Sequence, residues 1–249
     1  MALVEYDVAD GVAHIELNRP ETANAFDLAT TRRFAALVAR AGEDHRVRAV
    51  LVSGSGPRFC GGGDVASFAA AEDQPGYVHQ VAIELDAAYR TLSALERPVV
   101  AAVHGAVAAA GLALMLSCDI VVAAPGTKFV FAYPGIGFTP DCGVSYLLPR
   151  AIGQQRALAF ALAGKPASAS QAAEWGMVAE VVDDPKARAG DLARALADGP
   201  ATALGHVRRL LRRGWEMDRV ETGLEEARTI TEMVKGAEAQ GLIARFVGR

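Results

Sequence analysis

The chain has 249 residues, of which 51% are hydrophobic, and its 25 lysines and arginines against 29 aspartates and glutamates give a formal net charge of −4. This length suits one large α/β domain with a substantial core, and the absence of a basic run argues against nucleic acid as a partner. Because the start, MALVEYDVADG, does not resemble a signal peptide and no apolar run has membrane-spanning length, we expect a soluble, cytoplasmic protein that does not bind a membrane.

The first predicted elements are two strands joined as a hairpin. Apolar and polar residues alternate over 3–8 and 12–17, on either side of an Asp-Gly pair, which is typical of a β-hairpin. A loop follows at 18–26. Asp27 can then cap a helix whose apolar residues repeat at helical spacing.

A buried strand at 49–52 leads into the first of two glycine-rich turns. The motif FCGGGD at 59–64 contains three consecutive glycines, which leave their backbone N–H groups uncovered by side chains. The alanine-rich residues 65–76 then predict a mobile flap. A helix at 77–95 follows, with apolar residues on one face.

The second turn lies within PVVAAVHGAVAAAGLALMLSCDIVVAA at 98–124, which predicts a strand, a turn of small residues, a buried helix and a further strand. The N–H groups of Ala109, Ala110 and Gly111 begin that helix, and a helix N-terminus is suited to a negative oxygen. Two such turns can each supply one N–H to a single oxyanion. The alternative is that the small residues only allow a helix to pack on a sheet.

The rest of the chain contains a short strand, a loop, several helices and a last core strand. We expect the strand at 127–131, the loop AYPGIGFTPD up to Asp141, helices at 142–152 and 154–163, a short helix after Ser168, and the final strand at 180–182. Only helical patterns follow, at 186–198, 200–213, 218–235 and 236–247. These helices have more apolar surface than the core of one chain can bury, which predicts that they are buried against other subunits.

Cysteine and histidine spacing indicates neither a disulfide framework nor a metal site. The three cysteines have no CxxC spacing, and the five histidines form neither HxxxH nor HExxH. We therefore expect reduced thiols and no metal.

Several of these motifs together resemble the crotonase superfamily, the enoyl-CoA hydratase/isomerase fold. The resemblance rests on FCGGGD at 59–64, HGAVAAAGLALMLSCDIVVAA at 104–124, TPDCGVSYLLPRAIGQQRALAFALAGKPASASQAAEWGMVAEVV at 139–182 and the triplet NRP at 18–20. It implies an α/β spiral of ββα repeats with an acyl-CoA-binding core at 1–184 and a helical oligomerisation region at 185–249. It also implies a homotrimer or a dimer of trimers, with coenzyme A as part of the substrate and no separate cofactor.

The resemblance further implies a set of site residues. The N–H groups of Gly63 and Ala110 would hold the thioester oxygen, and Arg19 is either a phosphate contact or a solvated charge. The other positions implied to bind coenzyme A or substrate are Ala23, Asn24, Ala25, Gly61, Gly62, Asp64 and Val65. Residues 242–246 are implied to reach a neighbour's coenzyme A.

The expected chemistry follows from a departure from the hydratases. The resemblance places Ala113 and Tyr133 where hydratases carry two glutamates, and neither can take a proton from water at neutral pH. Asp141 matches the position of the sole carboxylate base of the isomerases, although helix capping is its alternative role. We therefore predict an enoyl-CoA isomerase, in which one carboxylate moves a proton from C2 to C4 through a thioester enolate.

Other functions stay open at this stage, including hydratase-like or thioesterase-like chemistry on an acyl-CoA and the three that follow. A dehalogenase branch has a nucleophilic aspartate at the position of Asp141, but it has a histidine where this chain has Asp86. Rearrangement of a ring-bearing epoxide is a second alternative, and a non-catalytic acyl-CoA-binding protein is a third. Asp86 is either a solvated charge or a contact of the acyl group, and Tyr133 either orients the substrate or packs in the core.

Overall fold

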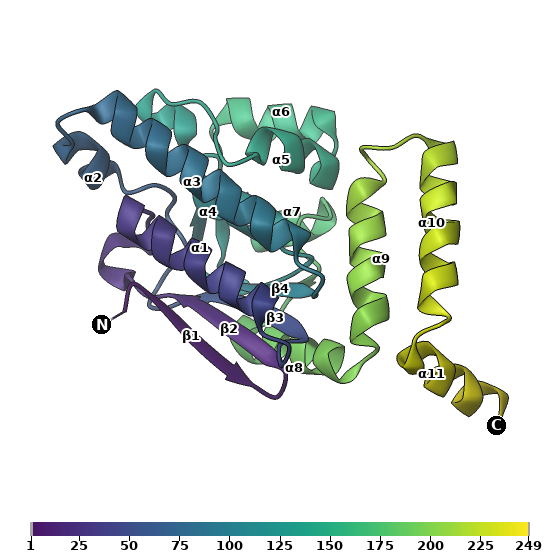
Figure 1. Cartoon of the computed structure of the whole chain (residues 1–249). Coiled ribbons are helices and arrows are strands. Elements are labelled where there is room, and N and C mark those ends of the chain that lie inside the picture. Colours follow the sequence, from purple (N-terminus) through teal and green to yellow (C-terminus); the bar gives the residue numbers. More distant parts are fainter. Residues whose placement is uncertain (1, 249) are drawn as a thin grey trace.

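The computed structural model describes residues 2–248, and a six-stranded sheet runs through its centre (Figure 1). The strands, in spatial order, are β1 (Val4–Ala9), β2 (Val12–Leu17), β3 (Ala49–Gly54), β4 (Val99–Val103), β6 (Ile120–Ala123) and β9 (Glu180–Val181). The predicted hairpin is present as the antiparallel pair β1–β2, and all other neighbours are parallel. Strands β3 and β4 are buried along their whole length, which explains their continuous apolar sequence.

The structure also contains a second, smaller sheet. It consists of β5 (Ala106–Ala108), β7 (Lys128–Val130) and β8 (Ala167–Ser168), with β7 between the other two. Isolated bridges link Phe26 to Gly63 and Cys60 to Val107. These bridges connect the N-terminal loop to the first glycine-rich turn, and that turn to the second.

The larger core lies on one face of the main sheet and includes residues of six helices, namely α1 (Leu28–Glu43), α3 (Gln74–Ala94), α4 (Ala110–Ser117), α5 (Val144–Ile152), α6 (Gln154–Ala163) and α7 (Ala169–Glu174). The short helix α2 (Val65–Ala70) has no buried residue and packs on α3. Phe26, Phe34 and Tyr89 pack edge to face at centroid distances of 5.7, 6.1 and 5.9 Å, which joins the N-terminal loop to α1 and α3. Every residue of α4 except Leu116 is buried, as expected for a helix that is apolar all round.

The segment expected to be a mobile flap at 65–76 forms α2 and the start of α3, with the non-helical residues 71–73 between them. Asp64 caps α2 by accepting from the N–H of Ser67, and Asp73 caps α3 by accepting from that of Gly76. Both are N-cap bonds of the ordinary kind. The helix predicted at 77–95 therefore begins three residues earlier, at Gln74.

The other face of the sheet is covered by α8 (Pro185–Asp198), as Figure 1 shows. Its buried residues include Ala189, Ala193 and Ala197, which recur every fourth position and pack on β3, β4 and β6. The sequence analysis placed this helix in the oligomerisation region. The short alanine side chains let it lie directly on the sheet, so by its packing it belongs to the core.

Helices α9 (Ala201–Arg213), α10 (Arg219–Met233) and α11 (Ala237–Val247) extend to one side of the core (Figure 1). Helix α9 is attached through the buried Arg208, whose guanidinium lies 2.5 Å from Asp119 and donates to three carbonyls at the C-terminus of α3. Helix α10 is attached to α9 by an ion pair between Arg209 and Glu225. None of the helices described within residues 2–248 is long and apolar enough to cross a membrane.

Candidate active site

The two glycine-rich turns lie side by side and are joined by main-chain hydrogen bonds. Phe59 N–H donates to His104 O at 2.9 Å, Cys60 N–H to Ala106 O at 3.2 Å, and Ala108 N–H to Cys60 O at 2.9 Å. These bonds continue the pairing of the sheets past the ends of β3 and β4. Turns that are 45 or more residues apart in the sequence are thereby held as one unit.

Each turn presents a backbone N–H that is not used within the fold. Among residues 2–248, no backbone carbonyl accepts from the N–H of Gly63 or from that of Ala110. Ala110 is the first residue of α4, so its N–H has no partner within the helix. The two predicted oxyanion donors therefore lie on paired turns, one of them at a helix N-terminus.

Asp141 does not have the capping role that was its alternative. Helix α5 begins at Val144, and its N-cap is Gly143 in a left-handed conformation with φ of 73°, without a side-chain cap. The N–H of Val144 instead donates to the backbone carbonyl of Asp141 at 3.1 Å. The Asp141 carboxylate accepts from the hydroxyl of Tyr133, at 2.8 Å from Oδ1.

Tyr133 therefore contacts the carboxylate directly. It is the first residue of the 3-10 helix η2 (Tyr133–Ile136), and its side chain is buried against Phe131. Burial, and then the charge of Asp141, raise the pKa of Tyr133 well above its usual range. The phenol is therefore a protonated donor at neutral pH. The sequence analysis left substrate orientation and core packing open for Tyr133 and did not anticipate this bond.

Tyr89 of α3 is a further buried phenol at this site, and the sequence analysis did not single it out. Its hydroxyl donates to the carbonyl of Ala110 at 3.1 Å. Burial, and then the nearby Cys142, Cys60 and Asp141, raise its pKa well above the usual range. Tyr89 therefore contacts the second turn and also lies near Asp141. A signal for it was available, because a tyrosine on an apolar helix face needs a buried hydrogen-bond partner.

The three cysteines are buried and reduced. Burial raises the pKa of Cys60 and that of Cys118 to about 12. Burial, followed by the charge of Asp141, also raises the pKa of Cys142. Since only the thiolate is nucleophilic, these thiols are not candidate nucleophiles.

Asp86 lies on α3 beside the loop that carries Asp141. A Cβ on Gly143 would lie 3.6 Å from Asp86 Oδ1. The Asp86 carboxylate pairs with Arg90 at 2.8 Å, and about a third of its side chain is exposed. Ala113, in contrast, is fully buried within α4 and supplies no group that could transfer a proton.

Aromatic side chains line the approach to Gly63. A Cβ on Gly63 would lie 2.6 Å from the ring of Phe68, which therefore covers this turn. Phe68 stacks on Phe138 at 6.4 Å and meets Tyr77 edge-on at 6.2 Å. These three residues, which we call the aromatic wall, come from α2, the loop before Asp141 and α3.

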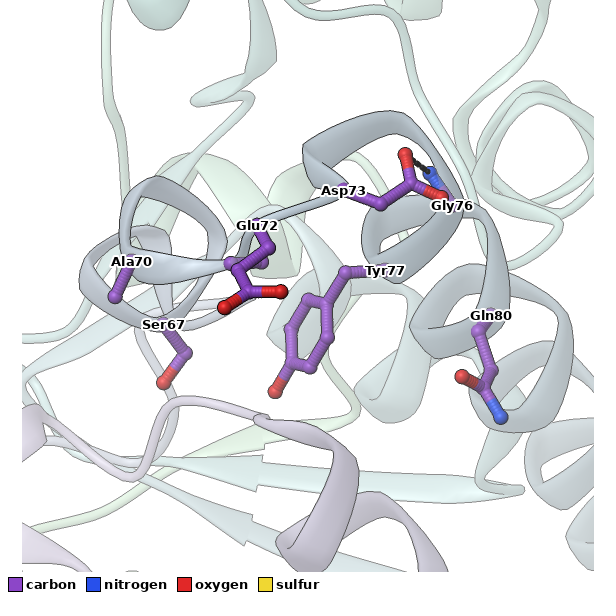
Figure 2. A pocket seen from close by; sticks show the side chains of 8 residues that line it. Ser67, Ala70, Glu72, Asp73, Gly76, Tyr77 and Gln80 are labelled. Atoms are coloured by element: carbon purple, nitrogen blue, oxygen red, sulfur yellow. Dashed lines mark hydrogen bonds between the residues drawn. The ribbon is translucent and has the colours of Figure 1, made fainter.

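An open groove continues from the aromatic wall between α2 and the first turns of α3. It has a volume of about 790 Å³ and is lined by Ser67, Ala70, Ala71, Glu72, Asp73, Gly76, Tyr77 and Gln80. Figure 2 shows the Glu72 carboxylate beside the Tyr77 ring, with Ser67 and Ala70 on one side of them and Gln80 on the other. Tyr77 belongs to both the groove and the wall, so the groove adjoins the turn that carries Gly63.

The N-terminal loop is fixed to the first turn by Asn24. Its buried side chain donates to the carbonyls of Ser55, Arg58 and Phe59 at 2.8 to 3.1 Å and accepts from Arg19 N–H at 2.8 Å. The carbonyl of the neighbouring Ala23 accepts from Gly61 N–H at 2.8 Å. The side chain of Asn24 is thus occupied within the fold, and the backbone N–H groups of Ala23, Asn24 and Ala25 donate to carbonyls of residues 19–22. The predicted contact of residues 23–25 with coenzyme A stays a prediction.

Arg19 is likewise occupied. Its guanidinium lies 3.0 Å from Asp64 and 3.2 Å from Asp27, donates to the carbonyl of Ala25, and is 13% exposed. Although burial acts to raise the pKa of Asp64, the bonds from Ser67 and Arg19 hold it below the usual range. Arg19 therefore braces α1 and α2 against the loop. The contact of Arg19 with a coenzyme A phosphate stays a prediction. Val65, at the start of α2, is exposed, and its contact with the substrate also stays a prediction.

The chain is similar to a known protein family and to several known proteins. The family model "Enoyl-CoA hydratase/isomerase" matches residues 7–249. The 1,2-epoxyphenylacetyl-CoA isomerase of Escherichia coli K12 is 37% identical over 256 residues, covering 100% of this chain and 97% of that protein. The 4-chlorobenzoyl coenzyme A dehalogenase-2 of an Arthrobacter species is 30% identical over 215 residues, covering 85% of this chain and 78% of that protein. A crystal structure named as an enoyl-CoA hydratase/isomerase of Mycobacterium abscessus is 36% identical, with a TM-score of 0.93 over 98% of this chain and 96% of that one.

Proposed function

The chain belongs to the enoyl-CoA hydratase/isomerase family and has the crotonase fold, and from this premise we propose that it is an acyl-CoA isomerase with Asp141 as its single base. One observation carries the proposal. The Asp141 carboxylate is held by Tyr133 and is not used to cap α5, and it lies close enough to Tyr89, which donates to the Ala110 carbonyl of the second turn, for its charge to add to the effect of burial in raising the pKa of that tyrosine.

The proposed reaction begins at C2 of a 3-enoyl-CoA. Asp141 removes the C2 proton, and the electron pair moves into the thioester to give an enolate. The N–H groups of Gly63 and Ala110 stabilise the enolate oxygen, an effect that is worth about 3 kcal/mol per donor in comparable sites. The protonated carboxyl then returns the proton to C4 as the double bond shifts to C2–C3. The reaction is balanced without a water, which suits a site with an alanine at position 113.

A panel of acyl-CoA esters tests this proposal. With 3-hexenoyl-CoA we expect formation of the conjugated 2-enoyl thioester, followed by its ultraviolet absorbance. Asp141→Asn should abolish this conversion and leave the affinity for the ester within a few-fold. Asp191→Asn, an exposed aspartate on α8, is the matched control. Unchanged turnover of the Asp141→Asn variant would remove Asp141 from the mechanism.

A second candidate is the rearrangement of a ring-bearing acyl-CoA epoxide. It is favoured by the 37% identity, over the whole chain, to 1,2-epoxyphenylacetyl-CoA isomerase, and by the aromatic wall beside Gly63. Including 1,2-epoxyphenylacetyl-CoA in the panel separates the two, because mass spectrometry distinguishes a rearranged ring from a shifted double bond. The dehalogenase alternative is less well supported, since Asp86 pairs with Arg90 where that branch has a histidine. Chloride release from 4-chlorobenzoyl-CoA would establish it.

The proposal includes self-association through α9–α11, as a homotrimer or a dimer of trimers. Large apolar side chains remain exposed there, namely Val207, Leu211, Val220, Leu224, Ile230, Phe246 and Val247. Exposed apolar residues gathered on a few helices are typical of a subunit interface. Residues 242–246 lie in α11 and are proposed to reach a neighbour's coenzyme A.

A further inference from the structure

The contact between Tyr133 and Asp141 is the starting point. The Tyr133 hydroxyl donates to Asp141 Oδ1 at 2.8 Å, and the phenol is only 5% exposed. Its ring packs on Phe131 at a centroid distance of 5.2 Å, and this contact restricts the position of the hydroxyl. Asp141 itself precedes two residues in left-handed backbone conformations, Cys142 and Gly143. The backbone therefore changes direction directly after Asp141, and the hydrogen bond from Tyr133 fixes the Asp141 side chain.

A hydrogen bond from a buried, well-packed donor limits the rotation of the carboxylate that accepts it, so the bond from Tyr133 selects one orientation of the Asp141 side chain. The Tyr133 hydroxyl is committed to this bond, so its contribution to the reaction acts through Asp141.

The other ionisable groups around Asp141 do not offer this support. Asp86 of α3 is a like charge that is largely neutralised by Arg90, and Tyr89 of the same helix donates to the Ala110 carbonyl instead. Cys142 supplies only a thiol, which is a weak donor. Tyr133 is thus the strong donor to the carboxylate among the described residues.

We infer that Tyr133 is the positioning residue of the proposed base: its hydroxyl holds the Asp141 carboxylate in the one orientation from which it removes the C2 proton and returns it to C4. This inference rests on the proposed function of Asp141. It assigns to Tyr133 a role on the carboxylate and none on the substrate.

Tyr133→Phe removes the hydroxyl and keeps the ring. We expect kcat to fall by about 10- to 100-fold, as for loss of a hydrogen bond to a charged group, while KM stays within about threefold. Tyr146→Phe, on the exposed phenol of α5, is the matched control and should change neither.

A double variant separates positioning from substrate contact. If Tyr133 acts through Asp141 and makes no contact with the substrate, adding Tyr133→Phe to Asp141→Asn should leave the affinity for the ester unchanged. A weaker ester affinity in the double variant, or a raised KM with an unchanged kcat in Tyr133→Phe, would overturn the inference. If Tyr133→Phe does not fold, 3-fluorotyrosine at position 133, a stronger donor of nearly the same size, should change kcat and leave KM within about threefold, and an unchanged kcat would overturn the inference.

These outcomes also separate the inference from the proposed function. Full turnover of Asp141→Asn contradicts the base itself, and the inference with it. Loss of turnover in Asp141→Asn, together with an unchanged kcat in Tyr133→Phe, contradicts only the role of Tyr133.

Discussion

Gly62 lies against Ala109, and no side chain fits between them. A Cβ on Gly62 would be 2.8 Å from the Cβ of Ala109 and 3.5 Å from the nitrogen of Ala110, and the φ of Gly62 is 108°. The close approach of the two turns therefore depends on a glycine that is both small and in a conformation that other residues rarely adopt.

Gly62→Ala should separate the two turns and misalign the N–H groups of Gly63 and Ala110. We expect kcat to fall by about 100-fold or more, which is the typical loss for one oxyanion donor. Thermal unfolding should register a cost of about 1–3 kcal/mol from backbone strain. Gly126→Ala is the control, because a Cβ there meets nothing within 4 Å. Equal kinetics of the two variants would show that the turns do not act together.

Arg19→Lys tests whether this residue braces the loop or binds coenzyme A. A lysine cannot reproduce the bonds to Asp64, Asp27 and the Ala25 carbonyl together, so we expect a loss of about 2 kcal/mol in stability. If Arg19 only braces the loop, kcat/KM should fall by the same factor for a coenzyme A ester and for the pantetheine thioester, which lacks the nucleotide phosphates. A loss restricted to the coenzyme A ester would establish a phosphate contact.

Arg208→Met should weaken the attachment of α9 to the core. The substitution leaves three carbonyls at the end of α3 without their donor and removes one of the two arginines paired with Asp119. Loss of one partner from a buried ionic network costs about 3 kcal/mol, measured here by urea unfolding at fixed protein concentration. Arg213→Met, on the exposed side of α9, should stay within about 0.5 kcal/mol. A similar cost for both variants would contradict the anchoring role.

Leu224→Glu tests the proposed association through the C-terminal helices. Light scattering of the wild type should give a multiple of the 26.0 kDa chain mass, and the variant should give a smaller species, because a buried charge opposes association. Ile83→Glu, an exposed apolar position on α3, serves as the control and should keep the wild-type mass. A wild type that is monomeric at assay concentration would contradict the proposal.

Local sequence patterns predicted most of the elements correctly. The hairpin β1–β2, the buried strands β3 and β4, and helix α4 follow from alternation, continuous apolar runs and small residues, which act between near neighbours in the chain. The motif FCGGGD likewise located the first turn, and the family resemblance is confirmed by the family match. Two segments have features that the patterns did not predict. Most of the expected flap is helical, with caps from Asp64 and Asp73, and α8 packs on the sheet through alanines that carry little apolar signal.

The sequence by itself determined which groups are present: two turns with uncovered N–H groups, one aspartate after a proline, and no glutamate at position 113. Only the tertiary structure decided what each group contacts. It joined the turns through Gly62 and Ala109, gave the Asp141 carboxylate to Tyr133 instead of to the start of α5, and engaged Arg19 with two aspartates. The reason is physical. Hydrogen bonds and close contacts between residues far apart in the chain depend on the direction of each side chain after packing, and spacing along the sequence does not contain that direction.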